Sequence, residues 1–309
     1  MISTYGILVA LSATAHAMNP QLQYRATPPA FSSIIVFGDS FSDNGNGSAR
    51  VSNSTWPPDP YYEGRFSDGI VWPEYVASNL SIPLYDYAVG GATTSNSLVR
   101  GYTGAGATIA VPSVGDQVAS FLGKATPQGQ AFTDLDSTAL ASPLFVLFAG
   151  ANDIIFNPNI SASQSYQALV QAGTQLQAAY DTAEVLTVSP PDLSKLPYGF
   201  YVDTVAKEEL QSFTNLLGDL LMSRTRFAAI NIDLRPLFDE FEYYAAPQAY
   251  GFYPLGKYGS CLQGAYGETS NVTLCEDAAR MVYWDEYHPT THAHSWIAKQ
   301  VLAVLDGPF

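Results

Sequence analysis

The chain has 309 residues, of which 47% are hydrophobic, and its 28 Asp and Glu outnumber 13 Lys and Arg to give a formal net charge of −15. This much apolar material in a chain of this length can bury a sizeable core, which excludes an intrinsically disordered protein. The negative charge makes nucleic acid and anionic membranes poor partners, because both carry the same sign. Neutral substrates fit such a surface better.

The first 17 residues form an apolar stretch that ends in Ala15-His16-Ala17. This pattern predicts a secretory signal peptide, which leaves residues 18–309 as one domain. No later stretch reaches the roughly 20 apolar residues that a membrane span requires. Five Asn-x-Ser/Thr sequons agree with secretion and predict glycosylation. They begin at Asn46, Asn53, Asn79, Asn159 and Asn271. The expected location is extracellular.

The only two cysteines, Cys261 and Cys275, lie in a segment rich in glycine and tyrosine. A secreted protein reaches an oxidising environment, in which two nearby cysteines form a disulfide. We therefore interpret this pair as a local disulfide. We expect this disulfide to hold the surrounding loop.

An unbroken apolar run at residues 34–37 leads into Gly38-Asp39-Ser40. Such a run fits a strand that is buried on both faces of a parallel sheet. Ligands bind at the carboxyl ends of strands in open α/β sheets, so Ser40 is a candidate nucleophile. Alternatively, Asp39 and Ser40 only cap a following helix.

Strand and helix patterns alternate along the rest of the chain, which predicts a parallel sheet covered on both faces. The expected strands are 34–37, 83–89, 144–149, 185–188 and 227–232, and the expected helices are 70–80, 114–122, 164–180, 203–224 and 289–305. Residues 48–69 and 92–110 have the composition of loops. The segment 237–284 is interpreted as a packed excursion, although its tyrosines at 243–258 could instead stack on a sugar ring.

Polar residues follow glycines at the ends of the second and third strands. Gly90-Gly91 allows a backbone path that leaves N–H groups pointing outward. Asn152 and Asp153 follow Gly150 in the same way, with helix capping as the alternative for Asn152 and a cap or brace as the expected role of Asp153. Residues 43–47 resemble a calcium loop only superficially, because apolar and glycine residues interrupt the required alternation of oxygen ligands.

Once the signal peptide is removed, the chain has three histidines, at 288, 292 and 294. A serine needs a base to become nucleophilic, and the base needs a partner to fix its tautomer. Ser40, His288 and Asp285 supply these roles. A zinc site at His288 and His292 is the alternative, although Pro289 stands where a zincin has glutamate. A surface patch of histidines is a third possibility. We expect no metal and no cofactor.

These segments, in this order, resemble the four sequence blocks of the GDSL, or SGNH, hydrolases. The resemblance implies a three-layer α/β/α sandwich with a mainly parallel, about five-stranded flavodoxin-like sheet, and ester hydrolysis through a serine acyl-enzyme. It also implies an oxyanion hole formed by the N–H groups of Ser40 and Gly91 and the side-chain amide of Asn152. Asp86 stands where the family has asparagine, so Gly90 is the fallback for Gly91.

The longer strings at residues 36–45, 64–69 and 72–75 resemble secreted fungal members of that family, which are similar to the acetylesterases of carbohydrate esterase family sixteen. This resemblance implies removal of acetyl groups from plant cell-wall carbohydrates. A lipase or phospholipase of the same fold is the alternative within the enzymes. A catalytically idle wall-binding protein is the alternative outside them. We expect a monomer whose partner is a small-molecule or oligosaccharide ester.

Overall fold

The computed structural model describes residues 31–123, 135–181, 183–223, 228, 230–267 and 271–306. The predicted signal peptide at residues 1–17 therefore lies outside the described residues. Five strands form one parallel sheet in the order β2-β1-β5-β6-β7. Their bounds are β1 Ser33–Gly38, β2 Leu84–Asp86, β5 Pro143–Phe148, β6 Glu184–Ser189 and β7 Ile230–Asp233.

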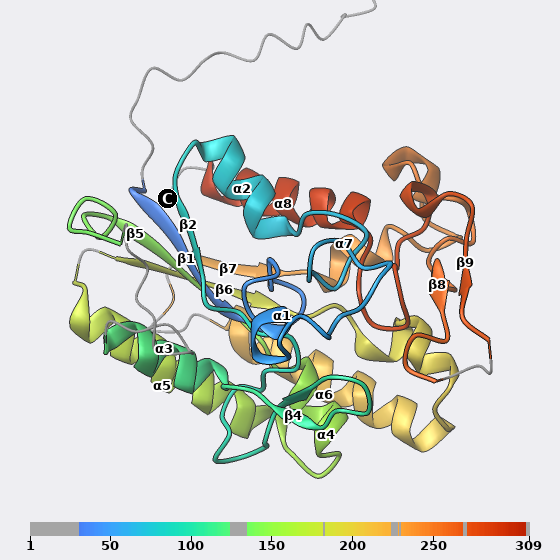
Figure 1. Ribbon diagram of the computed structural model, residues 1–309, viewed down its shortest axis with the longest axis horizontal. Helices are drawn as coiled ribbons and strands as arrows, with labels where there is room; N and C mark the ends of the chain where they lie inside the picture. Colours follow the sequence, from blue (N-terminus) through green and yellow to red (C-terminus); the bar gives the residue numbers. More distant parts are fainter. Residues whose placement is uncertain are drawn as a thin grey trace, which may run out of the picture.

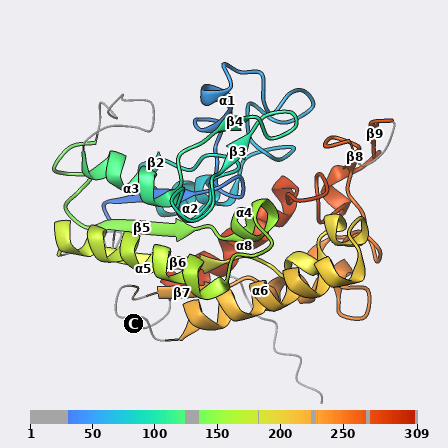
Figure 2. The same ribbon diagram turned by 90° about the horizontal axis from the view of Figure 1, so that it is seen from below.

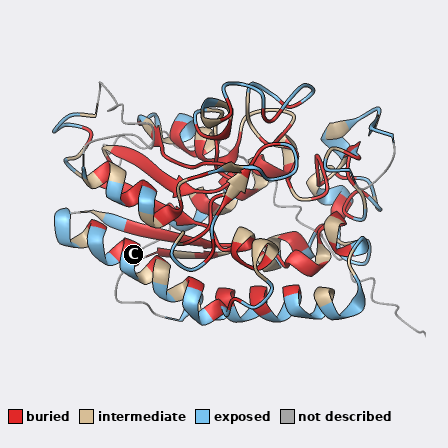
Figure 3. Cartoon of the chain, turned by 60° about the horizontal axis from the view of Figure 1, so that its bottom comes forward, coloured by how far each residue is buried: buried red, intermediate tan, exposed pale blue. Residues whose placement is uncertain are grey.

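Helices cover both faces of the sheet, so the domain is an α/β/α sandwich, as the sequence predicts (Figures 1 and 2). On one face α2 packs against α8, and on the other α5 lies between α3 and α6. The long helices are α2 Trp72–Leu80, α3 Val114–Leu122, α5 Ala162–Ala179, α6 Thr204–Met222 and α8 Thr291–Leu305. The strands are buried almost throughout, whereas the helices expose their outer sides (Figure 3).

Side-chain caps fix where several helices begin. Ser113 accepts a hydrogen bond from the backbone N–H of Asp116 at the start of α3, and Asp203 accepts one from Ala206 at the start of α6. Thr290 caps α8 by accepting from Ala293. The helix predicted to begin at Pro289 therefore begins at Thr291 instead, because the cap lies one residue after the proline.

Several short elements were not predicted from the sequence. The segment expected as a loop at 92–110 contains an antiparallel hairpin of β3 Tyr102–Thr103 and β4 Ile109–Ala110. A short helix, α4 Ala151–Phe156, directly follows β5, and the expected loop at 48–69 begins with α1 Ser48–Val51. These elements are too short for hydrophobic periodicity to reveal them. After β6 come two 3₁₀ turns, η1 Leu193–Lys195 and η2 Pro197–Phe200.

The excursion after β7 packs against the end of the sandwich and contains short elements of its own. These are α7 Arg235–Asp239, η3 Pro247–Tyr250, β8 Leu262–Gln263, β9 Thr273–Leu274 and η4 Ala278–Arg280. The disulfide predicted from the cysteine count joins Cys261 to Cys275, with an S–S distance of 2.09 Å. It joins the residue before β8 to the residue after β9, so this pairing is confirmed.

Candidate active site

Ser40 lies two residues after the end of β1, at the carboxyl edge of the sheet. The strand order reverses between β1 and β5, and an open α/β sheet binds ligands at such a switch point. The turn after β1 is held by the Asp39 carboxylate, which accepts a hydrogen bond of 3.0 Å from the backbone N–H of Phe41. Gln117 of α3 pairs with both backbone groups of Gly38. No helix begins at Ser40, so the capping alternative is wrong.

The side chain of His288 lies between those of Ser40 and Asp285 and contacts both. Its Nε2 lies 2.8 Å from Ser40 Oγ, and its Nδ1 lies 2.7 Å from Asp285 Oδ2. The backbone N–H groups of Tyr287 and His288 both donate to Asp285 Oδ1 at 2.8 Å, so a tight turn after Asp285 fixes the carboxylate relative to the imidazole. This arrangement can carry a proton away from the serine hydroxyl while the aspartate holds the ring tautomer.

Tyr61 contributes a fourth polar group that the sequence did not reveal. Its hydroxyl donates a hydrogen bond of 2.7 Å to Asp285 Oδ2. Burial, followed by the nearby Asp285 charge, raises the pKa of Tyr61 well above its usual value, so the phenol stays a donor. Tyr61 lies 224 residues before Asp285, and no local pattern marks a tyrosine in the 48–69 segment as its partner.

An aromatic ring covers one face of the imidazole. The centroid of Phe66 lies 4.9 Å from that of His288, in a tilted arrangement. Phe66 also occupies the space beside Gly90, where an added Cβ would lie 2.1 Å from its ring. The 64–69 string noted in the sequence thus packs directly against the candidate base.

Gly91 and Gly90 differ in their position relative to the cavity and in the use of their backbone N–H groups. Gly91 has a φ of +85° and lines the cavity, and an added Cβ there would lie 1.9 Å from the Tyr102 carbonyl oxygen, so only glycine fits. The N–H of Gly90 instead donates to Asp43 Oδ2 at 2.9 Å. Gly90 therefore uses its N–H to hold the turn and does not offer it to a ligand.

Asn152 lies in the first turn of α4, which begins at Ala151 beyond the end of β5. Its Nδ2 donates to the Ala92 carbonyl at 3.0 Å and lies 3.5 Å from Asp39 Oδ2. The neighbouring Asp153 points inward and accepts hydrogen bonds from Thr94 and Ser165. Asp153 thus ties α4, in which it lies, to the loop after Gly91 and to α5. This is the bracing role that the sequence analysis expected of it.

Asp43 explains why residues 43–47 resemble a calcium loop. Its carboxylate accepts hydrogen bonds from the backbone N–H groups of Gly45, Gly47, Ser48 and Gly90, at 2.7 to 3.0 Å. Its oxygens are therefore already occupied by the turn that they stabilise. The described ranges contain no group of three or more His, Cys, Asp or Glu side chains that could hold a metal ion.

The three histidines have different partners. Both ring nitrogens of His288 face Ser40 and Asp285, whereas His292 bonds to the Ala279 carbonyl and to Trp296. His294 is fully buried in α8, and this burial, together with the nearby His288, lowers its pKa to about 3. The zinc alternative at His288 and His292 and the surface-patch alternative both fail on this geometry.

Asp39 is the other titratable group beside the serine. Its side chain is 1% exposed, and burial raises its pKa to about 7, against the lowering effects of the Phe41 hydrogen bond and of His288. The carboxyl group can therefore hold a proton at mildly acidic pH.

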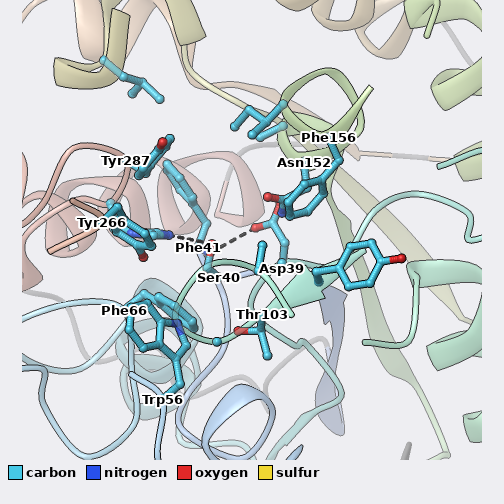
Figure 4. A pocket seen from close by; sticks show the side chains of 18 of the residues that line it. Asp39, Ser40, Phe41, Trp56, Phe66, Thr103, Asn152, Phe156, Tyr266 and Tyr287 are labelled. Carbon is cyan, nitrogen blue, oxygen red and sulfur yellow. Dashed lines mark hydrogen bonds between the residues drawn. The ribbon is translucent and has the colours of Figure 1, made fainter. Parts of the chain in front are cut away.

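A cavity of about 280 Å³ opens over Ser40, and its walls are largely apolar (Figure 4). The candidate residues Ser40, Gly91, Asn152 and His288 all border it. The apolar and aromatic lining comprises Phe41, Trp56, Phe66, Tyr102, Ile155, Phe156, Leu193, Leu196, Tyr266 and Tyr287.

The tyrosines at 243–258, proposed above as a possible sugar platform, do not line this cavity. Tyr243 and Tyr244 are exposed, and Tyr250 packs against Phe241 and Trp296. The rings beside the cavity come from residues distant in the sequence, such as Trp56 and Tyr266, and composition alone could not select them. The tyrosines at 243–258 therefore form no part of the wall of this cavity.

The five sequon asparagines are all exposed. Exposure permits glycosylation but does not demonstrate it, so this expectation stays a prediction. Among the described residues, none of the helices combines the length and the apolar character needed to cross a membrane.

A parallel sheet that carries a hydrogen-bonded serine, histidine and aspartate at its carboxyl edge has the geometry of a serine hydrolase. Residues 34–301 match the model of the GDSL-like lipase/acylhydrolase family. The chain belongs to this family.

Known proteins similar to the chain include a thermolabile hemolysin from Vibrio parahaemolyticus serotype O3:K6 (strain RIMD 2210633), with 27% identity over 89% of this chain. The match covers 64% of the hemolysin, less than two thirds of its length. An acetylesterase from Hypocrea jecorina is 32% identical over 43% of this chain and 38% of its own. A carbohydrate esterase family 2 enzyme with a carbohydrate binding domain, from Corynascus thermopiles (Myceliophthora fergusii), shares the fold with a TM-score of 0.51 at 14% identity, covering 88% of this chain and 65% of that one.

Proposed function

We propose that the chain is a secreted serine esterase that hydrolyses acetyl esters of carbohydrates through Ser40, His288 and Asp285. The observation that carries this proposal is the continuous contact from Asp285 through His288 to Ser40 Oγ, at the floor of a cavity. The acetylesterase name of one relative supports the acyl group. The negative charge of the chain supports a neutral substrate.

In the first half of the reaction, Ser40 Oγ attacks the ester carbonyl carbon while His288 Nε2 accepts the hydroxyl proton. The same nitrogen then gives this proton to the alcohol oxygen as its bond to the carbonyl carbon breaks. The alcohol leaves, and the acyl group stays on Ser40. Asp285 orients the imidazole and stabilises its charged form.

Negative charge develops on the carbonyl oxygen during the attack. We assign its stabilisation to the backbone N–H groups of Ser40 and Gly91 and to the side-chain amide of Asn152. Gly91 is chosen over Gly90 because the Gly90 N–H already donates to Asp43. A donor held in place contributes about 3 kcal/mol to such a transition state, and the Ala92 carbonyl anchors the Asn152 amide.

In the second half, a water molecule attacks the acyl carbon, and His288 takes one proton from that water. The bond to Ser40 Oγ breaks, the serine recovers its proton from His288, and the free acid leaves. This cycle returns every group to its starting state and uses no metal or cofactor.

Acetate release from acetylated xylo-oligosaccharides, measured beside hydrolysis of long-chain glycerides, tests the proposal. We expect acetate release by the wild type and none by Ser40→Ala. Labelling of Ser40 by an alkyl fluorophosphonate, located by peptide mass spectrometry, tests the nucleophile separately. An unlabelled Ser40 in an active enzyme would overturn the mechanism.

A lipase or phospholipase is the second candidate function. The apolar cavity wall that includes Ile155, Leu193 and Leu196 favours it, because such a wall could receive a longer acyl chain. A specificity constant that rises steadily from acetate to octanoate would select this candidate.

A further inference from the structure

The cavity over Ser40 has two chemically different sides. Trp56, Phe66, Tyr266 and Tyr287 lie on one side of the serine, and Asn152 and Phe156 lie on the other (Figure 4). An ester also has two different ends, the alcohol and the acyl group. The path of the proton from Ser40 through His288 to the leaving alcohol determines which side of the cavity binds the alcohol and which binds the acyl group.

The alcohol must leave on the side of His288, because His288 Nε2 is the atom that protonates the leaving oxygen. The rings nearest to His288 are those of Phe66 at 4.9 Å, Tyr287 at 6.0 Å and Tyr266 at 6.2 Å. Tyr266 also meets Tyr287 and Trp56 edge to face, at 5.0 and 5.6 Å. A leaving alcohol therefore meets a wall of aromatic rings.

This aromatic wall reaches solvent. Tyr266 is 37% exposed, although it lines the cavity. An alcohol that is larger than the cavity can therefore extend outward past this ring. The apolar faces of a sugar ring suit such a wall, because aromatic rings stack on these faces.

A different pair of rings, Tyr102 and Phe156, also lines the cavity. Phe156 stands one turn along α4 from Asn152, and the backbone carbonyl of Tyr102 packs against Gly91. The rings of Tyr102 and Phe156 meet edge to face with centroids 6.0 Å apart. The pair therefore stands beside Gly91 and Asn152, two of the three groups assigned to the oxyanion hole.

We propose that Tyr102 and Phe156 form the end wall of the acyl site and restrict it to short acyl groups, while Trp56, Tyr266 and Tyr287 form the site for the leaving alcohol. This inference rests on the proposed ester hydrolysis and specifies which end of the ester each wall binds. It makes Phe156 and Tyr102 determinants of acyl length and Tyr266 a determinant of the alcohol.

Two substrate series test the assignment. The first varies the acyl group from acetate to hexanoate with p-nitrophenol as the constant alcohol, and the second keeps acetate and compares p-nitrophenol with xylobiose as the alcohol. Each series is measured for the wild type, Phe156→Ala, Tyr266→Ala and a control, Tyr244→Ala, whose ring is 92% exposed and lies outside the cavity. Thermal melting checks that each variant is folded. If Phe156→Ala does not fold, Phe156→Leu takes its place, and if Tyr266→Ala does not fold, Tyr266→Phe takes its place.

Phe156→Ala should raise the hexanoate-to-acetate ratio of kcat/KM at least tenfold, because each methylene that enters an apolar site contributes about fourfold. The same variant should leave the alcohol comparison within about twofold of the wild type. Tyr266→Ala should lower the preference for the sugar ester about tenfold and leave the acyl series unchanged. Tyr244→Ala should change neither series.

Exchanged effects, in which Phe156→Ala alters the alcohol comparison and Tyr266→Ala alters the acyl series, would overturn the assignment. A wild type that already prefers hexanoate would overturn the end wall. Exchanged effects would leave the proposed function intact, whereas a preference of the wild type for hexanoate would also favour the lipase candidate. Absence of hydrolysis of p-nitrophenyl acetate by the wild type would instead overturn the proposed function and this inference with it.

Discussion

The hydroxyl of Tyr61 donates a hydrogen bond of 2.7 Å to Asp285 Oδ2, the same oxygen that lies 2.7 Å from His288 Nδ1. Asp285 is fully buried, so each of its donors replaces water that the carboxylate would otherwise hold. Tyr61 thus acts on Ser40 through two intermediate side chains, as a positioning residue.

Tyr61→Phe should lower kcat about tenfold with little change in KM. The substitution keeps the ring and removes one hydrogen bond to a buried charge, which costs about 1.5 to 3 kcal/mol. Part of this cost appears as lost stability and part as a less well-oriented imidazole. Steady-state kinetics and thermal melting measure the two parts. Tyr62→Phe is the matched control, since Tyr62 is the neighbouring tyrosine and is 40% exposed. Equal kinetics for the Tyr61 variant and the wild type would contradict the positioning role.

Ser40→Ala should keep less than about a hundredth of the wild-type turnover of p-nitrophenyl acetate, since loss of a triad nucleophile costs several orders of magnitude. The fold should survive, because the hydroxyl projects into a cavity and contributes little to packing. Circular dichroism and melting temperature check the fold beside the rate. Turnover above that level in pure protein would mean that another group is the nucleophile.

His288→Ala should lose activity as severely as the serine variant, whereas His292→Ala should keep most of it. His292 forms hydrogen bonds with the Ala279 carbonyl and the Trp296 side chain. Within the part of the chain that the structure describes, it does not contact Ser40. Incubation with EDTA should leave the rate unchanged. A loss that zinc restores would contradict a mechanism without metal.

The parallel sheet and the serine, histidine and aspartate were predictable because their signals are local. The buried run before Ser40 and the spacing of Asp285, His288 and Pro289 each occupy fewer than ten residues. The cavity wall was not predictable in this way. It is built by single side chains from distant segments, such as Trp56, Tyr102 and Tyr266, and only the fold brings them together.

Two further features were outside the reach of sequence patterns. The β3–β4 hairpin has two residues in each strand, which is too short for an alternating pattern. The Tyr61 contact with Asp285 spans 224 residues. Conversely, the aromatic composition of 243–258 suggested a substrate platform, although those rings pack or are exposed and do not line the cavity.

Protein purified from the medium of a secreting host should begin after Ala17 and carry a Cys261–Cys275 disulfide. Mass spectrometry of unreduced peptides measures both features. Glycans should be found at some of the five exposed sequon asparagines. An intact amino terminus in secreted protein would contradict the predicted signal peptide, and two free thiols would contradict the disulfide.

The stability of the fold should depend on the protonation of Asp39. Burial raises the pKa of this carboxyl from 3.8 to about 7, so between these values the folded protein keeps a proton that the unfolded chain has released. The stabilising contribution is complete below pH 3.8 and is lost as the pH rises through about 7. The loss is about 1.4 kcal/mol per pH unit and about 4 kcal/mol in full.

Asp39→Asn tests this dependence, because asparagine has nearly the shape of the protonated carboxyl and does not titrate. Urea unfolding at pH 4, 5, 6, 7 and 8 gives the free energy of unfolding of each protein. Relative to the wild type, the variant should gain stability steadily from pH 4 to pH 7 and then level off. Asp181→Asn, which changes an exposed carboxyl, should follow the wild type throughout. A constant difference between Asp39→Asn and the wild type across this range would show that Asp39 is ionised in the folded protein and that its burial is offset by donors such as the Phe41 N–H.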